Sequence, residues 1–559
     1  MTTVALAVAS VLASCTGSSG PVPPSTAPPG SSASPSAPAP HPSQPNVVVL
    51  LSDDQAFRIF DRSLMPNVFG QLVDKGVNFT RAYVNVSQCC PSRASILTGL
   101  YSHDTGVDSN TVPLDGRLPL RPVFPTALRE AGYTTGLFGK YLNSEPCAPQ
   151  PGWDRWVCGT PNTEVNPELN IDGQRLSFKG YTADILASRA VDFIHAAEAK
   201  NQPFFVYYAP KDPHLPANDP RDKRPVPPYE PPSLNADPQP ASKPAWTRLP
   251  PLDARNLGKA QNWHTLMTRQ IPPLDAAMGT ILRAIGRQSN ETLVIFMSDN
   301  GFMYGEHRMT SKNEPYEESV RVPMVIRFPQ VLPEDQAFSS SALLSNVDLA
   351  PTIMDAAGIP WKADGTSLLP LVGRKSATVR DGLLIEWCQA GHTKPCQSEK
   401  KAEELNVLAI PNYWELETER YAYVEYATGE RELYDLVSDP YEMTNLASDP
   451  AHASLVARLH AQLAALRAPP QTPDTTIATG PTGTVTTGKV TFVFFSQSRT
   501  TGFRCKLTGP GHSGWTPCDH GWIPYRDLKP GAYTFTVQAI DAAGHPDPTP
   551  ASRDFTLAA

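Results

Sequence analysis

The chain has few charged residues, and they form no basic block. Asp, Glu, Lys and Arg make up 18% of its 559 residues, compared with about 25% in typical soluble domains. The 47 Lys and Arg residues are outnumbered by 55 Asp and Glu residues, which gives a net charge of −8. A protein that neutralises the phosphates of nucleic acid needs a positive surface. We therefore expect no nucleic-acid partner.

Long apolar segments are also missing after the N-terminus. Beyond residue 15, no apolar run approaches the ~20 residues of a membrane-spanning helix, which excludes a polytopic membrane protein. Residues 1–15 form a short apolar signal segment that ends in Leu-Ala-Ser-Cys and resembles a bacterial lipobox. We predict lipidation of Cys15 and an exported, cell-surface bacterial lipoprotein, attached to the membrane by its lipid anchor only. A plain secretory signal peptide is the alternative.

Proline, by contrast, is abundant. The chain has 60 prolines, and residues 16–45 consist almost wholly of Pro, Ser, Ala, Gly and Thr. Such a segment cannot bury apolar area and stays extended, so we predict a linker. Proline is also dense in residues 213–251, which predicts a long surface loop beside the functional cleft.

Three apolar runs indicate the core of the main domain. Residues 46–54, 203–214 and 292–301 each begin apolar and end in polar residues. This pattern is typical of strands buried on both faces of a parallel sheet, whose carboxyl ends carry the site. Helical periodicity over 181–199 and 273–287 separates the runs. The sequence therefore predicts an α/β domain over 46–360.

Two further units follow the main domain. We predict a small antiparallel subdomain over 361–468, with an amphipathic helix at 450–467 that closes it. Residues 475–559 alternate apolar and polar residues between Gly and Pro turns, which predicts an all-β, immunoglobulin-like sandwich module.

The nine cysteines fit an exported protein. An oxidising compartment permits disulfide bonds between cysteines that lie close in the sequence. The candidate pairs are Cys147 with Cys158, Cys388 with Cys396, and Cys505 with Cys518. Cys90 is left over, and we expect it to be a small buried side chain.

The most informative stretch is Cys-Cys-Pro-Ser-Arg at 89–93, followed by Leu-Thr-Gly at 97–99. Pro91 suits the first turn of a helix through 92–100, which places residue 89 at the positive helix N-terminus. An anionic group is favoured there. Arg93, one turn later, can fix such a group by charge-assisted hydrogen bonds.

This stretch resembles the signature Cys-x-Pro-Ser-Arg-x-x-x-Leu-Thr-Gly of type I sulfatases, within the alkaline phosphatase superfamily, and the resemblance extends from residue 46 to about 450. It implies an α/β, alkaline-phosphatase-like fold with a central mixed sheet flanked by helices. It also implies that Cys89 is oxidised to formylglycine (3-oxoalanine) by a formylglycine-generating enzyme, which is then a maturation partner.

The resemblance also implies a metal site. The residues that match the family's ligands, beside Cys89 itself, are Asp53, Asp54, Asp299 and Asn300. Their carboxylate and amide oxygens are hard donors that suit Ca²⁺, with Mg²⁺ as the alternative. Adjacent acids are costly to bury without a cation, because like charges repel strongly at low dielectric.

Three more residues match family positions that bind sulfate oxygens and protonate the leaving alcohol: Lys140, His214 and Lys312. Because cleavage of a sulfate ester develops negative charge on the alcohol oxygen, a cation or acid is needed beside it. The predicted catalytic set is therefore Cys89 and Arg93 together with these three.

One position departs from many arylsulfatases. Leu142 stands where they have a histidine that serves as base when the aldehyde is regenerated. The pattern here is instead similar to the N-acetylglucosamine-6-sulfatase and extracellular endosulfatase branch. The candidate bases or substrate-binding residues are His307 and His103, each with a plain surface role as the alternative.

The resemblance implies hydrolysis of sulfate monoesters, on a sulfated carbohydrate of the N-acetylglucosamine-6-sulfate type or on an aryl sulfate. In that mechanism, the hydrated aldehyde at 89 attacks sulfur and then expels sulfate through its second hydroxyl. Two alternatives stay open: a phosphonate or phosphate monoester hydrolase of the same superfamily, and an inactive surface lipoprotein that binds glycans.

Overall fold

The structure is a computed structural model. It describes residues 44–112, 114, 123–143, 147–159, 163–217, 221–236, 242–387, 410–467, 474–496, 500–518, 521–541 and 544–558. Three predictions lie outside the described residues: the lipidation of Cys15, most of the linker over 16–45 and the pairing of Cys388 with Cys396. No helix within the described ranges combines the length and the apolar character needed to cross a bilayer.

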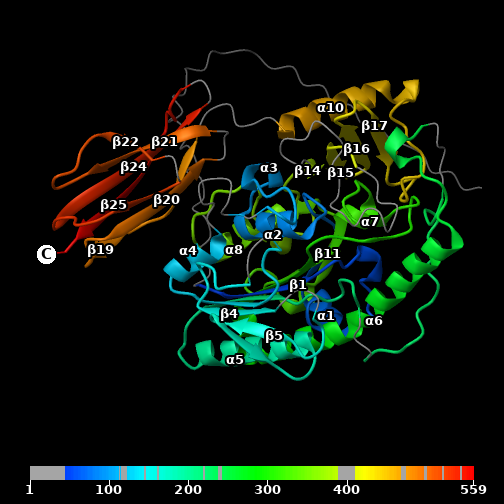
Figure 1. The fold of residues 1–559 in the computed structure, drawn as a ribbon, viewed down its shortest axis with the longest axis horizontal. Helices are drawn as coiled ribbons and strands as arrows, with labels where there is room; N and C mark the ends of the chain where they lie inside the picture. Colours follow the sequence, from blue (N-terminus) through cyan, green and yellow to red (C-terminus); the bar gives the residue numbers. More distant parts are fainter. Residues whose placement is uncertain are drawn as a thin grey trace, which may run out of the picture. The chain divides into compact units, whose positions relative to one another are not determined.

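A mixed sheet forms the centre of the main domain (Figure 1). The strand order is β12-β2-β11-β8-β1-β7-β3-β4-β5-β6, and β13 pairs with β2 off this path. The central strands β8, β1, β7, β3 and β4 are parallel to one another, whereas β11, β5 and β6 run antiparallel to their neighbours. The bounds are β1 Asn46–Ser52, β2 Val77–Tyr83, β3 Thr134–Gly139, β4 Arg155–Gly159, β5 Glu168–Ile171, β6 Gln174–Ser177, β7 Phe204–Ala209, β8 Thr292–Ser298, β11 Arg321–Arg327, β12 Phe338–Ser340 and β13 Leu344–Ser345.

The continuous apolar run of β1 has a direct structural reason. Successive strand residues point to opposite faces, so Val47 and Val49 enter one hydrophobic core while Val48 and Leu50 enter the other. All seven residues of β1 are buried. A strand between two covered faces has no solvent side and therefore needs no polar alternation.

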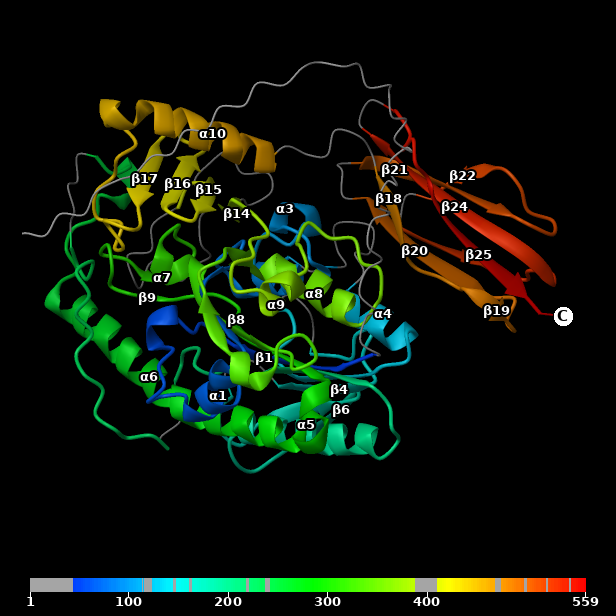
Figure 2. The same cartoon turned by 180° about the vertical axis from the view of Figure 1, so that it is seen from behind.

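Helices cover both faces of this sheet (Figures 1 and 2). On one face lie α1 Pro66–Gln71, α5 Thr182–Glu198 and α6 Ala254–Ala284, and on the other α2 Cys89–Thr98, α4 Phe124–Glu130, α8 Leu349–Ala356 and α9 Leu369–Gly373. The predicted central mixed sheet flanked by helices is confirmed. The remaining short elements are α3 Ser102–Thr105, α7 Glu317–Val320, β9 Met303–Tyr304, β10 Thr310–Ser311 and the 3-10 turns Phe57–Ile59, Val73–Lys75, Ala245–Thr247, Gly286–Glu291, Glu334–Gln336, Asn346–Asp348 and Pro450–His452.

One helix is longer than the sequence pattern predicts. Periodicity indicates a helix over 273–287, but α6 begins at Ala254, where the Asp253 side chain accepts a hydrogen bond from the backbone of Asn256. Pro272 and Pro273 lie inside the helix. Proline removes a backbone donor and usually breaks a helix, so the sequence pattern reveals only the part after the two prolines.

A four-stranded antiparallel sheet follows, in the order β14-β15-β16-β17. Its strands are Gly382–Trp387, Tyr413–Thr418, Tyr421–Tyr426 and Arg431–Asp435, and α10 spans Ala453–Arg467. The helix buries Leu459 and Leu463 against Leu384, Leu416 and Tyr423 of the sheet (Figure 2). The predicted antiparallel sheet and closing helix are thus present.

Two all-β sheets lie beyond residue 474. One has the order β18-β20-β23 and the other β19-β25-β24-β21-β22. Their strands are β18 Thr475–Thr479, β19 Gly483–Val485, β20 Val490–Ser496, β21 Thr500–Thr508, β22 Trp515–Pro517, β23 Trp522–Tyr525, β24 Gly531–Asp541 and β25 Ala551–Leu557. Phe492, Phe535 and Phe555 pack in the core that the two sheets share. An immunoglobulin-like topology stays a prediction, as do the domain boundaries.

Two of the predicted disulfides are present, Cys147–Cys158 and Cys505–Cys518. The first joins β4 to the segment after β3, and the second lies in the all-β region. Cys90 is buried and takes part in neither bond, as expected for a small packed side chain.

Candidate active site

The carboxyl ends of four neighbouring strands place most of the predicted site residues together. Asp53 and Asp54 follow β1, and Asp299 and Asn300 follow β8. Lys140 directly follows β3, and His214 comes five residues after the end of β7. Because these strands are parallel neighbours, their ends meet at one edge of the sheet.

Helix α2 brings position 89 to the same edge. The helix begins at Cys89, which is 1% exposed, so its backbone N–H groups and positive dipole end lie at the cluster. The hydroxyl of Ser92 donates to the backbone oxygen of Asp299, and Asn346 Nδ2 donates to Ser92 Oγ across 2.9 Å. These bonds tie the first turn of α2 to the loop that follows β8.

Each buried carboxylate of the cluster has a cationic partner. Lys140 Nζ lies 2.6 Å from Asp53 Oδ2, and Arg93 Nε lies 2.7 Å from Asp299 Oδ2. Lys312 pairs with Asp54 and also donates to Cys89 Sγ at 2.9 Å. The Cys89 thiol itself lies 3.6 Å from Asp53 Oδ1. Position 89 therefore sits between carboxylates and the ammonium group of Lys312.

These charges set the protonation states. Burial alone would raise the pKa of the Asp53 carboxyl, but the positive charges of Lys140 and Arg93 lower the pKa to about 2. At Asp54 burial is again the largest influence and would raise the pKa, but the combined positive charges of Lys312, His214 and Lys140 lower it. At Cys89 burial prevails over Lys140 and Lys312 and raises the pKa of the thiol to about 12. The acids are thus ionised, while the unmodified cysteine is a neutral thiol and a poor nucleophile.

His214 approaches the cluster from the segment after β7. Its Nε2 atom lies 3.6 Å from Asp54 Oδ2, and its Nδ1 atom contacts the backbone oxygen of Leu215. The side chain is 29% exposed, so it forms part of the rim. Burial lowers the pKa of the imidazole, which makes the neutral form the resting state.

The residues present fit a divalent cation. One ligand atom from each of Asp53, Asp54, Cys89 and His214 lies within 4.8 Å of the others. Asn300 donates through Nδ2 to Asp54 Oδ1 at 2.7 Å, whereas its buried Oδ1 atom has no hydrogen-bond partner among the described residues. Buried amide oxygens are normally satisfied, so this oxygen is available as a ligand. Hard oxygen donors of this kind suit Ca²⁺ or Mg²⁺.

The two other candidate histidines lie elsewhere. His103, on α3, places its Nδ1 atom 2.8 Å from Glu386 Oε1. His307 is buried, and its ring stacks on that of Tyr316 with centroids 4.1 Å apart. Within the described contacts neither imidazole is linked to Cys89, and their assignment as bases stays a prediction. Leu142 is buried in the hydrophobic core beside β1, a place where a charged imidazole would be desolvated.

Sequence patterns alone do not reveal every residue that shapes the site. Besides holding Ser92, Asn346 accepts a hydrogen bond from the backbone of Asn85 at 2.9 Å. Gly301 is required for a close approach, because a Cβ atom there would lie 2.2 Å from the backbone oxygen of Glu318. A single Asn or Gly carries no spacing signal, so only the folded contacts identify these positions.

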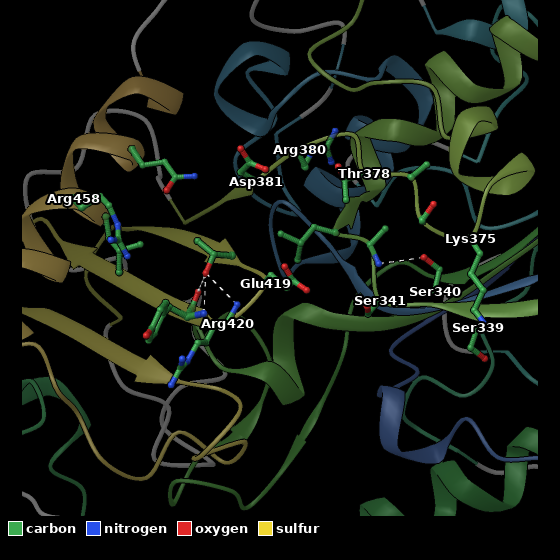
Figure 3. A pocket seen from close by; sticks show the side chains of 18 residues that line it. Ser339, Ser340, Ser341, Lys375, Thr378, Arg380, Asp381, Glu419, Arg420 and Arg458 are labelled. Atoms are coloured by element: carbon green, nitrogen blue, oxygen red, sulfur yellow. Dashed lines mark hydrogen bonds between the residues drawn. The ribbon is translucent and has the colours of Figure 1, made fainter. Parts of the chain in front are cut away.

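A separate cavity of about 530 Å³ lies between the segment after β12, the turn between β15 and β16, and α10 (Figure 3). Two of its three arginines are held by acids: Arg380 lies 2.6 Å from Asp348, and Arg420 lies 2.7 Å from Asp435. Cys89 and the residues bonded to it do not line this cavity. The cavity is therefore distinct from the Cys89 cluster.

Comparison with known proteins gives two family matches. A family model described as Sulfatase matches residues 45–359, and one described as N-sulphoglucosamine sulphohydrolase, C-terminal, matches residues 305–469. The first match covers more than half of the chain, and together the two span both the central sheet and the four-stranded sheet.

Curated relatives are similar over much of the chain. The human N-acetylglucosamine-6-sulfatase is 30% identical over 462 residues, which cover 72% of this chain and 81% of the relative. The extracellular sulfatase SULF-1 homolog of Drosophila melanogaster is 30% identical over 368 residues, or 60% of this chain. The match spans only 32% of that longer relative.

Solved structures share the fold. One neighbour, a structure in complex with its substrate D-glucosamine-2-N,6-O-disulfate, superposes with a TM-score of 0.62 at 23% identity. The superposition covers 76% of this chain and 97% of the neighbour. The similarity therefore extends over nearly the whole neighbouring protein.

Proposed function

Because this chain belongs to the sulfatase family and has the alkaline-phosphatase-like sulfatase fold, we propose that it hydrolyses sulfate monoesters at the cluster around Cys89. The observation that carries the proposal is the convergence of Lys140, Lys312 and Arg93 on position 89 at the start of α2. A helix N-terminus with several cations nearby favours a bound sulfate group.

We propose that Cys89 acts after oxidation to formylglycine by a maturation enzyme. The unmodified residue is a buried thiol whose pKa is raised to about 12 by burial, so it is a poor nucleophile as it stands. The hydrated aldehyde supplies an oxygen nucleophile and a second hydroxyl through which sulfate can leave. The other residues of the chain need only orient this group and balance its charge.

A cation, which we propose to be Ca²⁺ with Mg²⁺ as the alternative, would be held by residue 89 together with Asp53, Asp54, Asp299 and Asn300. When bound, it supplies Lewis-acid charge that lowers the pKa of a hydroxyl group and polarises sulfate oxygens. The orphaned Oδ1 atom of Asn300 and the low pKa of Asp53, lowered to about 2 by Lys140 and Arg93 against the effect of burial, support this assignment.

The side chains of the cluster have separate tasks. Lys140 and Lys312 bring positive charge to the oxygens of the transferring sulfate group, where such charge lowers the barrier most. Arg93 bridges Asp299 and the backbone oxygen of Lys140, which lies 2.8 Å from Nη1, and so holds two sides of the site in register. The departing alcohol is protonated by His214 or by Lys312 Nζ. Because His214 Nδ1 faces the backbone oxygen of Leu215, the histidine can donate from Nε2 only after that atom has gained a proton.

The proposed substrate is a sulfated sugar of the glucosamine-6-sulfate type. This follows from the human relative, an N-acetylglucosamine-6-sulfatase that matches 72% of the chain. We further propose export and attachment through a lipid on Cys15, which agrees with the extracellular relative. The proposed units are 46–360 and 361–468 for the enzyme and 475–559 for a spacer or binding module.

The test uses the full chain produced together with a formylglycine-generating enzyme. We expect turnover of N-acetylglucosamine-6-sulfate, with kcat/KM for a phenyl sulfate at least ~10²-fold above that for the matching phosphate and phosphonate esters, since the site is built for one transition state. Peptide mass spectrometry should show an aldehyde at residue 89. Cys89→Ala should lower kcat by at least ~10⁴-fold with an unchanged circular dichroism spectrum.

Each failure has its own meaning. An unaltered cysteine at position 89 in fully active protein would contradict the formylglycine mechanism. Faster turnover of the phosphonate ester would mean that the protein is a phosphonate monoester hydrolase and not a sulfatase. Aldehyde-containing protein that binds sulfated sugars without turnover would favour the inactive glycan-binding lipoprotein.

A further inference from the structure

A second group of metal-ligating side chains lies apart from Cys89. His307 follows β9, Glu318 belongs to α7, and Glu442 follows β17, and these residues are 4%, 1% and 0% exposed. One ligand atom from each lies within 4.8 Å of the other two. His307 Nε2 and Glu318 Oε2 are 3.8 Å apart, too far for a hydrogen bond.

Both glutamates are anchored through one carboxylate oxygen and unpartnered at the other, and the imidazole of His307 is held by stacking on Tyr316. Arg58 Nη2 donates to Glu318 Oε1 at 3.3 Å, and the backbone N–H of Glu317 donates to Glu442 Oε2 at 2.9 Å. Within the described part of the chain, Glu318 Oε2, Glu442 Oε1 and both ring nitrogens of His307 have no hydrogen-bond partner. Buried polar atoms are rarely left this way. Four of them in one place indicate a missing ligand.

The backbone around His307 also points to a built site. His307 has φ +52° and Arg308 φ +65°, in the left-handed region that non-glycine residues seldom adopt. Two hydrogen bonds hold this turn: His307 N donates to Ser233 O at 2.8 Å, and Arg308 N donates to Gly305 O at 3.2 Å. Such strain persists where the surroundings fix a side chain for a purpose.

Acidic side chains outnumber cationic ones around His307. Two cations, Arg58 and Lys243, accompany four buried acids: Glu306, Glu318, Glu432 and Glu442. The buried acids thus outnumber the two cations, and a bound cation would offset this excess of acidic groups.

We propose that His307, Glu318 and Glu442 form a second metal site that takes a divalent transition-metal ion of the Zn²⁺ class. One imidazole and two carboxylates are a ligand set typical of such ions, with water in the fourth position. Ca²⁺ fits less well, because it takes six to eight oxygen ligands. The anchors on Glu318 and Glu442 are outer contacts of the kind that fix ligands in metal sites.

The site supports the loop that carries Asp299 and Asn300. Gly301 N donates to Ser319 O and Phe302 N donates to Glu318 O, each across 2.9 Å. An ion that holds Glu318 therefore fixes the chain directly after Asp299 and Asn300. This role is structural and does not depend on the reaction proposed for Cys89.

The test measures metal content in the full-length protein. Wild-type chain is equilibrated with Zn²⁺ and Ca²⁺, desalted and analysed by inductively coupled plasma mass spectrometry. We expect about one equivalent of Zn²⁺ in wild type and in Cys89→Ala, and at least a roughly ten-fold lower Zn²⁺ affinity in His307→Gln and Glu442→Gln. His264→Gln is the matched control, because His264 is also buried but stacks on Tyr229 without a carboxylate partner among the described contacts.

A spectroscopic measurement on the wild type covers the case in which a variant fails to fold. Zinc-edge X-ray absorption should show nitrogen and oxygen neighbours at about 2.0–2.2 Å, including one imidazole and no sulfur. Absence of Zn²⁺ in the wild type would overturn the proposal in favour of a buried water or a proton shared by Glu318 and Glu442. A sulfur ligand, or full Zn²⁺ content in His307→Gln, would also overturn it. Loss of sulfatase activity alone would bear only on the Cys89 site.

Discussion

Lys312 donates a hydrogen bond to the sulfur of Cys89 across 2.9 Å, although the two residues lie 223 positions apart in the sequence. The same ammonium group pairs with Asp54. Lys312 therefore connects position 89 with the acidic pair that follows β1. It lies on the short segment after β10, Thr310–Ser311, and not on the central sheet.

We predict that Lys312→Gln lowers kcat/KM for a sulfate ester by about 10²–10³-fold, the usual effect of removing one preorganised charge from a transition state. Steady-state kinetics on matured protein measure it. Lys211→Gln is the control: Lys211 follows β7 and pairs with Glu164 at 3.3 Å, and its loss should change kcat/KM by a few-fold at most. An equal loss of kcat/KM in both variants would mean that Lys312 has no specific role in catalysis.

Asn346 gives a prediction about positioning. Asn346→Asp removes the Nδ2 donor to Ser92 and should cost about 1–3 kcal/mol of unfolding free energy, because a buried partner is lost. Since α2 then loses one tie to the loop after β8, we expect kcat to fall about ten-fold as position 89 moves out of alignment. Urea unfolding and kinetics on the same samples provide both numbers.

Asn445→Asp is the matched control for that experiment. Asn445 is also buried, and its Nδ2 atom donates to Ser242 O at 2.7 Å and Arg431 O at 3.0 Å in the four-stranded sheet region. Its replacement should lower stability similarly but leave kcat unchanged. A parallel fall of kcat in this variant would mean that the effect of Asn346 is only global destabilisation.

The ion pair between His103 and Glu386 leads us to predict that the stability of the fold depends on pH. Burial would lower the pKa of its imidazole, but Glu386 and Asp104 outweigh burial and raise the pKa to about 11, against 6.5 for the free side chain. A group with a raised folded-state pKa stabilises the fold fully below the unfolded pKa, and this contribution is lost as pH rises through the folded pKa. The window is therefore from about pH 6.5 to about pH 11.

We expect the Tm difference between wild type and His103→Gln to be largest at pH 6 and to shrink steadily toward pH 11. Calorimetry at matched ionic strength measures it. His195→Gln is the control, because His195 is exposed on α5 and has no ion pair among the described contacts. A pH-independent difference for His103→Gln would contradict the pairing with Glu386.

Removing the cation and adding it back tests whether it binds at the proposed ligands Asp53, Asp54, Asp299 and Asn300. Added Ca²⁺ should raise the Tm of metal-free protein, since a ligand that binds only the folded state stabilises that state. The gain is about 2.7 kcal/mol when the free ligand concentration is a hundred times Kd. Asp54→Asn should abolish this gain, and the exposed Asp335→Asn should retain it. An equal gain in Asp54→Asn would place the ion elsewhere.

Much of the fold can be predicted because its signals are local. The apolar run of β1 is buried on both faces, so the sequence at 46–52 already shows that the sheet is covered by helices on both sides. Pro91 and the residues around it likewise predict the start of α2 within a few positions. A misleading local signal produces a local error: Pro272 and Pro273 lie inside α6, and the predicted helix therefore begins too late in the sequence.

The amino-acid sequence by itself determined three buried strands of the central sheet, a helix that starts close to Cys89 and the chemical types of the site residues, because these depend on neighbours in the chain. Only the tertiary structure decided which charges meet: Lys312 with Cys89, Asn346 with Ser92, and His307 with Glu318 and Glu442. Those encounters join segments far apart in the chain. Strand register and packing against two cores set their geometry, and no local pattern records it.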